Sequence, residues 1–162
     1  MRTILTHPDA ALRQVSHAVQ NFDAHLRALC DEMKQLMADG PGGVGIAAPQ
    51  LGEQARVIVV DCSLGQRPCR HHGQLVMVNP MIEEHSGSVL GREGCLSVPD
   101  WVAMVPRAKT VHVSYQNELG MYQSLSATAF EARVIQHELD HLDGILFIDR
   151  VLSTHDLVRR MG

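Results

Sequence analysis

The sequence predicts an α+β fold in which antiparallel strands pack around a central metal-binding helix. The middle of the chain holds short runs of β-branched residues separated by glycine, proline and asparagine, which is typical of antiparallel strands. Two segments have apolar residues at helical spacing, and the second contains the motif H-E-x-x-H. A length of 162 residues suits one domain, spanning residues 1–162.

The first forty residues are predicted to form an extended arm and one helix. Residues 1–20 contain a turn at 7–9, and their apolar side chains should pack on the body of the protein. Residues 21–37 carry apolar side chains at helical spacing. Asn21 is the expected N-cap of this helix, and Gly40 should end it.

Strands are expected in the middle of the chain wherever apolar or β-branched runs lie between turn residues. Asn79-Pro80 should close one strand, Gly87 should bend another, and Pro106-Arg107 should separate two more. Residues 117–120 should form the turn of a hairpin. The predicted strands are 56–60, 75–78, 82–90, 101–105, 110–115 and 121–125.

A polar loop is predicted over residues 61–73, and it contains Cys69, His71 and His72. Cysteine and histidine together can bind a metal. No second pair follows at a suitable spacing, so the sequence favours a solvated surface loop over a metal site here.

The segment from Gln136 to Gly144 contains the motif H-E-x-x-H at His137, Glu138 and His141. Residues four apart on an α-helix differ by about 40° around its axis, so both histidines project from one face and can bind one metal ion. Glu138 can reach the surroundings of that metal without binding it, which suits a general base. The alternative is a surface helix whose two histidines are incidental.

Other signals support a helix at this point in the chain. Thr128 and Glu131 are spaced as a capping box at its start, and Gly144 stands where a C′ glycine would end it. Phe130 and Val134 would then lie on the same face as the motif residues.

A catalytic divalent metal site also needs a third protein ligand and an open position. Downstream of the motif the candidate is His155, but Ser153 and Asp156 predict the cap of a separate last helix around it. Upstream, Cys95 follows a glycine in the strand-like stretch E-G-C-L-S, where a thiolate meets little steric hindrance. One cysteine with two histidines suits Fe(II), Zn, Ni or Co rather than Mg or Ca.

A third stretch, G-V-G-I-A-A-P-Q, covers residues 43–50. Small residues such as Gly45 let the backbone run close to a neighbouring group, and Gln50 can offer an amide N–H to an oxyanion. Alone, the stretch could equally be a glycine-rich turn before a strand. No Lys-Ser or Lys-Thr follows, so it is not a phosphate-binding loop.

Together the three blocks make the chain resemble peptide deformylase, a family of metallohydrolases that remove the N-formyl group from new bacterial-type polypeptides. The family motifs G-x-G-x-A-A-x-Q, E-G-C-x-S and Q-H-E-x-D-H occur in this order at 43–50, 93–97 and 136–141. Flanking matches such as Asn79-Pro80 extend the resemblance over nearly the whole chain. The resemblance therefore implies a peptide-deformylase-like fold.

The resemblance also implies a mechanism. Cys95, His137 and His141 would bind the metal, with Fe(II) preferred in cells and Zn, Ni or Co as substitutes. Metal-bound hydroxide would attack the formyl carbonyl on the N-terminal methionine of newly made polypeptides and release formate. Glu138 would act as general base and then as general acid.

Further roles follow from the positions of residues beside the motifs. The metal and the Gln50 amide would stabilise the oxyanion, and the resemblance implies the Leu96 backbone N–H as a further donor. Gly45 is the fourth residue expected in the catalytic group, with Glu138, Gln50 and Leu96. Glu93 and Arg107 form a buried pair in one hypothesis and are two unrelated charges in the other. The candidates for the pocket of the methionine side chain are Val44, Phe130, Val134 and His137.

One departure from the family pattern concerns substrate binding. Many members carry an arginine three residues past the proline of the second motif, and this arginine is thought to help hold the peptide. The chain has Val102 there. We expect the change to affect substrate affinity or peptide-length preference and to leave the metal chemistry untouched. The segment 153–162 has room for only about two helical turns, so a secondary or specialised deformylase is a hypothesis beside the housekeeping one.

Composition limits the other partners. A net charge of −4 with mixed signs gives no basic face, so we expect neither a nucleic-acid nor a membrane partner. The sequence contains no apolar run of transmembrane length and no signal-peptide pattern, and its four cysteines form no disulfide framework. These features predict a cytoplasmic protein whose partners are formyl-Met nascent peptides, with a possible transient association with the ribosome.

Two other function classes compete with deformylation. A zinc endopeptidase is disfavoured because the third ligand candidate is an upstream cysteine and no downstream ligand is suitable. A non-catalytic metal-binding or ribosome-associated protein is disfavoured by Glu138 and Gln50, since a purely structural metal site needs neither residue.

Overall fold

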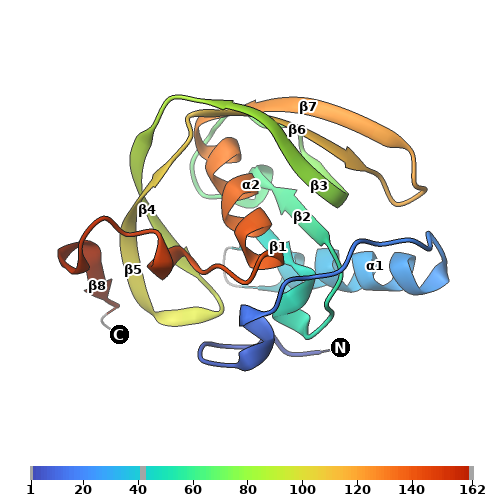
Figure 1. Cartoon of the computed structure of the whole chain (residues 1–162), viewed down its shortest axis with the longest axis horizontal. Coiled ribbons are helices and arrows are strands. Elements are labelled where there is room, and N and C mark those ends of the chain that lie inside the picture. Colours follow the sequence, from blue (N-terminus) through green and yellow to red (C-terminus); the bar gives the residue numbers. More distant parts are fainter. Residues whose placement is uncertain (1, 41–42, 161–162) are drawn as a thin grey trace.

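The structure is a computed structural model that describes residues 2–40 and 43–160. The described chain forms two antiparallel sheets and two α-helices (Figure 1). The larger sheet has the strand order β1-β2-β3-β6-β7, and the smaller one has the order β4-β5-β8. The α-helices and strands are α1 (Ala24–Asp39), β1 (Gly45–Ala47), β2 (Val57–Asp61), β3 (Gln74–Ser86), β4 (Val89–Cys95), β5 (Val98–Arg107), β6 (Thr110–Gln116), β7 (Tyr122–Thr128), α2 (Ala129–Leu142) and β8 (Leu157–Arg159).

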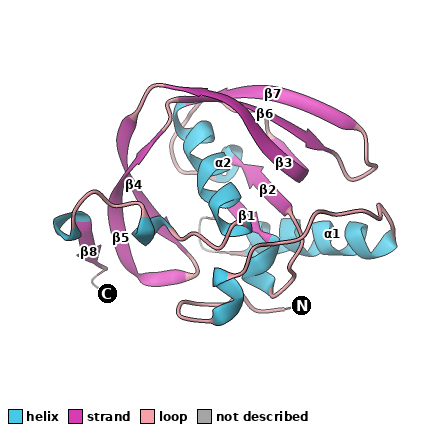
Figure 2. Ribbon diagram, in the orientation of Figure 1, coloured by secondary structure: helices cyan, strands magenta, loops and turns pink. Residues whose placement is uncertain are grey.

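Helix α2 occupies the centre of the molecule, enclosed by the strands of both sheets (Figure 2). Eleven of its 14 residues are buried, including both histidines of the motif. A helix that is buried on almost all sides holds its polar side chains at fixed positions, since each of them needs a partner inside the protein. The predicted α+β fold with a central histidine-bearing helix is confirmed.

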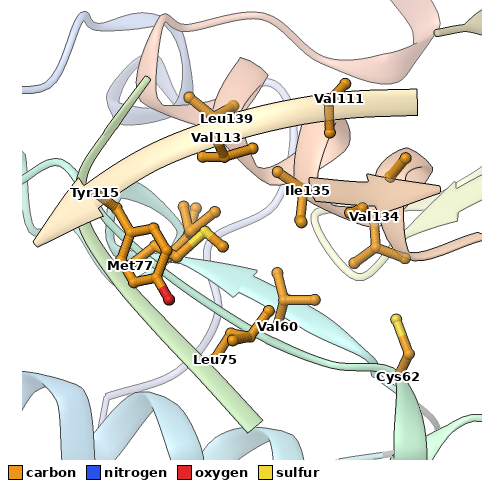
Figure 3. Close-up of a cluster of buried hydrophobic side chains, with 14 of the residues drawn as sticks. Val60, Cys62, Leu75, Met77, Val111, Val113, Tyr115, Val134, Ile135 and Leu139 are labelled. Atoms are coloured by element: carbon orange, nitrogen blue, oxygen red, sulfur yellow. The ribbon is translucent and has the colours of Figure 1, made fainter. Parts of the chain in front are cut away.

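Strand β2 separates two hydrophobic cores. All five of its residues are buried, and successive side chains point to opposite faces. Ile58 and Val60 face the core under α2, shown in Figure 3, where they pack with residues of β3, β6 and α2. Val57 and Val59 face the second core, which α1 covers. The larger sheet is thus fixed between the two helices, and β1 at its edge is held beside α2.

Helix α1 forms where its apolar spacing predicts, but its cap differs. The structure places the N-cap at Asp23, whose carboxylate accepts a hydrogen bond from the Leu26 N–H at 3.1 Å. The predicted cap at Asn21 is therefore wrong by two residues. Aspartate and asparagine cap equally well, and the sequence alone did not distinguish them. Gly40 ends the helix as predicted.

Strand β3 continues through Asn79-Pro80, where the sequence predicted an end. Asn79 has a φ of 53°, and the pairing with β6 shifts register around it, so the dipeptide forms a bulge instead. The Asn79 side chain exchanges hydrogen bonds with the backbone of Val19, which explains how the irregular strand is held. Gly87, with a φ of 72°, ends β3 and turns the chain into the smaller sheet.

The remaining predicted strands agree in position but differ in length. Strand β5 runs through Pro106-Arg107, which the sequence placed between two strands. The turn at 117–120 is confirmed, because Asn117 accepts the N–H groups of Leu119 and Met121. Its return strand, β7, extends directly to the start of α2.

The start of α2 lacks the predicted capping box. Thr128 occupies the N-cap position but makes no side-chain cap bond, and Ala129 has a φ of 54°. The Glu131 carboxylate instead accepts the backbone N–H of His72 at 2.7 Å and contacts its ring Nδ1 at 2.6 Å. A tertiary contact between Glu131 and the 61–73 loop therefore replaces the predicted capping box between Thr128 and Glu131.

The N-terminal arm packs against the first two sequence motifs, and the C-terminal end of the described chain pairs with the smaller sheet. In the N-terminal arm, Leu5 donates to the Gln50 carbonyl and His7 donates to the Ser97 carbonyl, each at 2.7 Å. Ser153 caps a last short helix as predicted, but this helix is a single 3-10 turn, Thr154–Asp156, and the chain continues into the strand β8. No helix in the described chain has both the length and the apolarity to cross a membrane.

Candidate metal centre

Three predicted ligands converge at one point. His137 and His141 lie one turn apart on α2, and Cys95 ends β4 at the tip of a tight hairpin with β5. Their ligand atoms all lie within 4.8 Å of one another, and Cys95 Sγ is 3.4 Å from Nε2 of His141. This is the one such group found within residues 2–40 and 43–160.

The donor atoms fit a divalent transition metal. One sulfur and two imidazole nitrogens are the soft, nitrogen-rich set that binds Fe, Zn, Ni or Co, and three protein ligands leave a position open. Both histidines are buried, and Cys95 is half-buried. Cys95, His137 and His141 therefore fit a transition metal. They do not form a solvated loop, because the histidines are buried, and they do not form a calcium site, because they offer no oxygen ligand.

A cavity of about 280 Å³ opens beside the three ligands. One side is formed by the free edge of β4 and the hairpin turn, and another by the loop that leads into β1. Phe130, Val134 and His137 of α2 line it together with Val44, so all four predicted pocket residues meet there. Phe130 is 42% exposed, which places it at the cavity rather than in the core.

Glu138 lies against the metal ligands with part of its carboxylate unpaired. Its Oε1 is buried and has no hydrogen-bond partner among the residues that the structure describes, and the side chain lines the cavity. Burial raises the pKa of the Glu138 carboxyl to about 7, because a charged carboxylate loses hydration there. A buried carboxylate without a partner is costly in structural terms and is typical of a functional group.

Gly45 brings the backbone of β1 close to this carboxylate. A Cβ atom at Gly45 would lie 2.6 Å from Oε2 of Glu138 and 2.9 Å from Cγ1 of Val134. No side chain larger than hydrogen fits between the strand and the helix. The predicted close backbone approach is present, and the group that it approaches is Glu138.

Gln50 is buried between the first and second motifs. Its Oε1 accepts the Ala47 N–H at 2.9 Å, while Nε2 donates to Ser97 Oγ at 3.0 Å and lies 3.7 Å from Cys95 Sγ. The amide thus helps to position the hairpin that carries Cys95. Gln50 and Leu96 both line the cavity, where an oxyanion would have to bind.

Glu93 is the centre of a buried charge network that reaches His137. Its Oε1 lies 2.8 Å from Nδ1 of His137, so the ring is oriented with Nε2 toward the metal site. Arg107 donates to both Glu93 oxygens, and Arg133 donates to Oε2 at 2.7 Å. Burial opposes ionisation, but the hydrogen bonds from Arg107 and His137 lower the pKa of Glu93 to about 2. The hypothesis of a buried Glu93–Arg107 pair is correct.

Comparison with known proteins shows that the chain is similar in sequence to one family. The family model described as polypeptide deformylase matches residues 1–156 of the chain. A peptide deformylase of Desulfotalea psychrophila is 43% identical over 150 residues, which are 93% of this chain and 87% of that protein.

The chain belongs to the polypeptide deformylase family. Solved structures agree with this assignment. The crystal structure of a peptide deformylase from Legionella pneumophila superposes with a TM-score of 0.86 and 37% identity, covering 96% of this chain and 88% of that one. A peptide deformylase from Synechococcus elongatus, solved in complex with actinonin, gives a TM-score of 0.85 and 39% identity, covering 96% and 81% of the two chains.

The sequence-based interpretation of a peptide deformylase, a metallohydrolase, is confirmed. The metal site of Cys95, His137 and His141 is confirmed as well, and its metal is not specified by the geometry. The catalytic roles of Glu138 and Gln50, and those of Leu96 and Gly45, stay predictions.

Several residues that support this deformylase site were not singled out from the sequence. Asp140 accepts from Arg107 at 2.6 Å and from Arg150 at 2.8 Å, and Arg133 reaches the Val89 and Val105 carbonyls. The signal was present in and just before the third motif, because Asp140 lies three residues after His137 and Arg133 lies four before it, on one helix face. A buried charged residue three or four positions from a metal ligand on a helix is therefore a candidate for a residue that helps to position the ligand.

Proposed function

We propose that this deformylase removes the formyl group from formyl-Met nascent peptides with Glu138 as the proton carrier. The observation that supports it is the buried Oε1 of Glu138 beside the Cys95/His137/His141 group, for which the described part of the chain offers no hydrogen-bond partner. Glu138 takes a proton from the attacking water and then gives it to the leaving amine. Formate and a free N-terminus are the products.

Cys95, His137 and His141 would hold Fe(II), with Zn, Ni or Co as substitutes. When bound, such a metal polarises the formyl carbonyl and acidifies water. The thiolate of Cys95 favours a soft or borderline metal over magnesium. Both Fe(II) and a thiolate are oxidisable, so oxygen should inactivate the iron form faster than the nickel form.

The oxyanion is stabilised by groups on the hairpin side of the cavity. Gln50 offers its side-chain amide and Leu96 its backbone N–H, and both residues line the cavity. To bind the oxyanion, Gln50 exchanges its long contact with Cys95 Sγ and keeps its bond to Ser97. Gly45 contributes indirectly, because its missing side chain allows Glu138 to occupy its position.

The substrate peptide binds along the edge of β4. The methionine side chain enters the apolar part of the cavity formed by Val44, Phe130 and Val134. Residues 92–96 line the cavity consecutively, and residues 92–95 of them belong to the edge strand β4, so an extended peptide can pair with the free backbone groups of this strand. These substrates are nascent chains, which agrees with a cytoplasmic location and a transient association with the ribosome.

The test is formate release from a formyl-Met-Ala-Ser peptide by anaerobically purified, Fe(II)-loaded protein. Glu138→Ala should lose about 10²–10⁴-fold in kcat and retain its metal, because the carboxylate moves the proton and does not bind the ion. Glu84→Ala, which changes an exposed glutamate on β3, is the matched control. Actinonin should inhibit the unmodified protein competitively.

Two outcomes would contradict this proposal. Full activity of Glu138→Ala would show that another group moves the proton. Cleavage of casein without formate release from the formyl peptide would indicate an endopeptidase, and a metal-loaded protein without either activity would indicate a non-catalytic binding protein.

A further inference from the structure

Two arginines, Arg92 and Arg160, lie on the exposed rim of the cavity together with Gly94. Arg92 lies on β4, and Arg160 directly follows β8, at the far edge of the smaller sheet. The strand β5 separates them in the sheet order, so the two charges reach one cavity from different strands.

Strand register explains how they meet. Gly94 pairs with Val102 of β5, and Val102 pairs with Val158 of β8, so these residues share one face of the smaller sheet. Side chains alternate along a strand, and therefore Arg92 and Arg160, each two residues from a member of this row, lie on the same face.

The guanidinium of Arg160 lies directly over Gly94. Its Nη2 is 3.2 Å from the position that a Cβ at Gly94 would take, and Cγ1 of Val102 is 3.4 Å from that position. The backbone N–H of Arg160 donates to the Asp100 carbonyl at 2.7 Å, which fixes the start of the side chain. Arg160 thus covers Val102, which is 5% exposed, and reaches the rim over a glycine that leaves room for it.

The charges of these two arginines are not neutralised by the described protein. Within residues 2–40 and 43–160, neither Arg92 nor Arg160 forms an ion pair, and the carboxylate of Asp100 pairs with neither of them. The other arginine in the cavity wall, Arg133, is paired with Glu93. The rim therefore carries net positive charge although the whole chain has a formal charge of −4.

We propose that Arg160, together with Arg92, makes this enzyme prefer formyl-Met peptides that carry an acidic side chain within the two or three residues after methionine. The inference rests on the proposed path of the peptide along β4. An extended peptide advances about 3.3 Å per residue, so its next side chains pass the rim soon after the methionine enters the cavity. A carboxylate there gains from two cations, and a lysine is repelled by them.

The experiment compares three peptide amides, formyl-Met-Ala-Glu, formyl-Met-Ala-Gln and formyl-Met-Ala-Lys, on the Fe(II)-loaded full chain. Glutamine has nearly the shape of glutamate without its charge. The unmodified enzyme should favour the Glu over the Gln peptide by about three- to fivefold in kcat/KM, the size of an exposed ion pair, and the difference should lie in KM. Raising the salt to about 1 M should remove most of it.

Variants of Arg160 test whether the preference for an acidic peptide comes from the arginines on the cavity rim. Arg160→Gln should lower kcat/KM more for the Glu peptide than for the Gln peptide and should improve the Lys peptide, while Arg160→Lys should keep part of the preference. Arg159→Gln is the matched control, because Arg159 pairs with Trp101 and does not line the cavity.

The outcomes separate this inference from the deformylase activity itself. An equal kcat/KM for the Glu and Gln peptides in the unmodified enzyme would overturn the charge preference and leave deformylation intact. Equal losses for all three peptides in Arg160→Gln would overturn it as well, because they would indicate a structural role of β8. Absence of formate release from every peptide would contradict the proposed function instead.

Discussion

Gly45 is a residue at which a single methyl group has a defined consequence. The Cβ of alanine would lie 2.6 Å from Oε2 of Glu138 and within 2.9 Å of Val134. Because the interior is close-packed, the added atom has to displace the carboxylate or the strand. The glycine motif at this position therefore serves the position of the general base, whereas the sequence suggested only a close approach of the backbone.

Gly45→Ala should lower kcat by about 10²-fold, since displacement of a reacting group by about 1 Å has an effect of this size. The metal content, measured by atomic emission, should remain unchanged, because no ligand is touched. Gly43→Ala is the control from the same loop, since its Cβ would meet only Leu96 Cδ1 at 3.6 Å, an ordinary contact. Unchanged kcat in Gly45→Ala would show that Glu138 can move without loss.

At the scale of elements, the sequence predicted those parts whose signals are local. Apolar spacing located α1 and α2, and Asn117 with Gly120 located the hairpin between β6 and β7. The errors arose where a distant residue decides the outcome. Glu131 accepts a hydrogen bond from His72 instead of forming the predicted capping box. The Val19 backbone N–H donates to Asn79 and so holds it in a bulge.

The site shows the same division between local and distant signals. Its metal ligands were predictable, because two are set by helical spacing and the third by a motif with a defined order. The network around Glu93 joins β4, β5 and α2, and its partners are brought together only by the fold. The pairing of β8 with β5, which brings Arg160 to the cavity, gave no signal in the sequence.

The charge network between these elements gives a prediction for Glu93→Gln. Removal of the carboxylate leaves Arg107 and Arg133 buried with less compensation, which should cost about 3–5 kcal/mol in the free energy of unfolding. It also removes the acceptor that orients His137, so metal affinity should fall about 10–100-fold. Urea unfolding and competition with a chelator measure the two effects. Glu84→Gln, on the surface of β3, should change neither.

An isolated loss of stability, with unchanged metal affinity, would contradict the orienting role of Glu93. It would leave the network as a purely structural link between α2 and the smaller sheet. Loss of affinity without loss of stability would instead show that the two arginines find other partners.

At the scale of the whole molecule, a metal held by Cys95, His137 and His141 would add a link between the smaller sheet and α2. Cys95 belongs to the smaller sheet, while His137 and His141 belong to α2, which packs on the larger sheet. Strand β2 lies in the interior of the larger sheet and contributes no ligand. A bound ion should therefore stabilise the link between the sheets more than the cores themselves.

Removal of the metal by a chelator should lower the stability by the binding free energy, about 2.7 kcal/mol when the free metal had been at 100 times its Kd. The effect should be local. Amide hydrogen exchange should accelerate in the β4–β5 hairpin around Cys95, because the thiolate is released there, while the amides of β2 stay protected by two cores. Exchange that accelerates equally in β2 would instead indicate that the ion supports the whole fold, and unchanged exchange in the hairpin would show that the Glu93 network holds the smaller sheet without the metal.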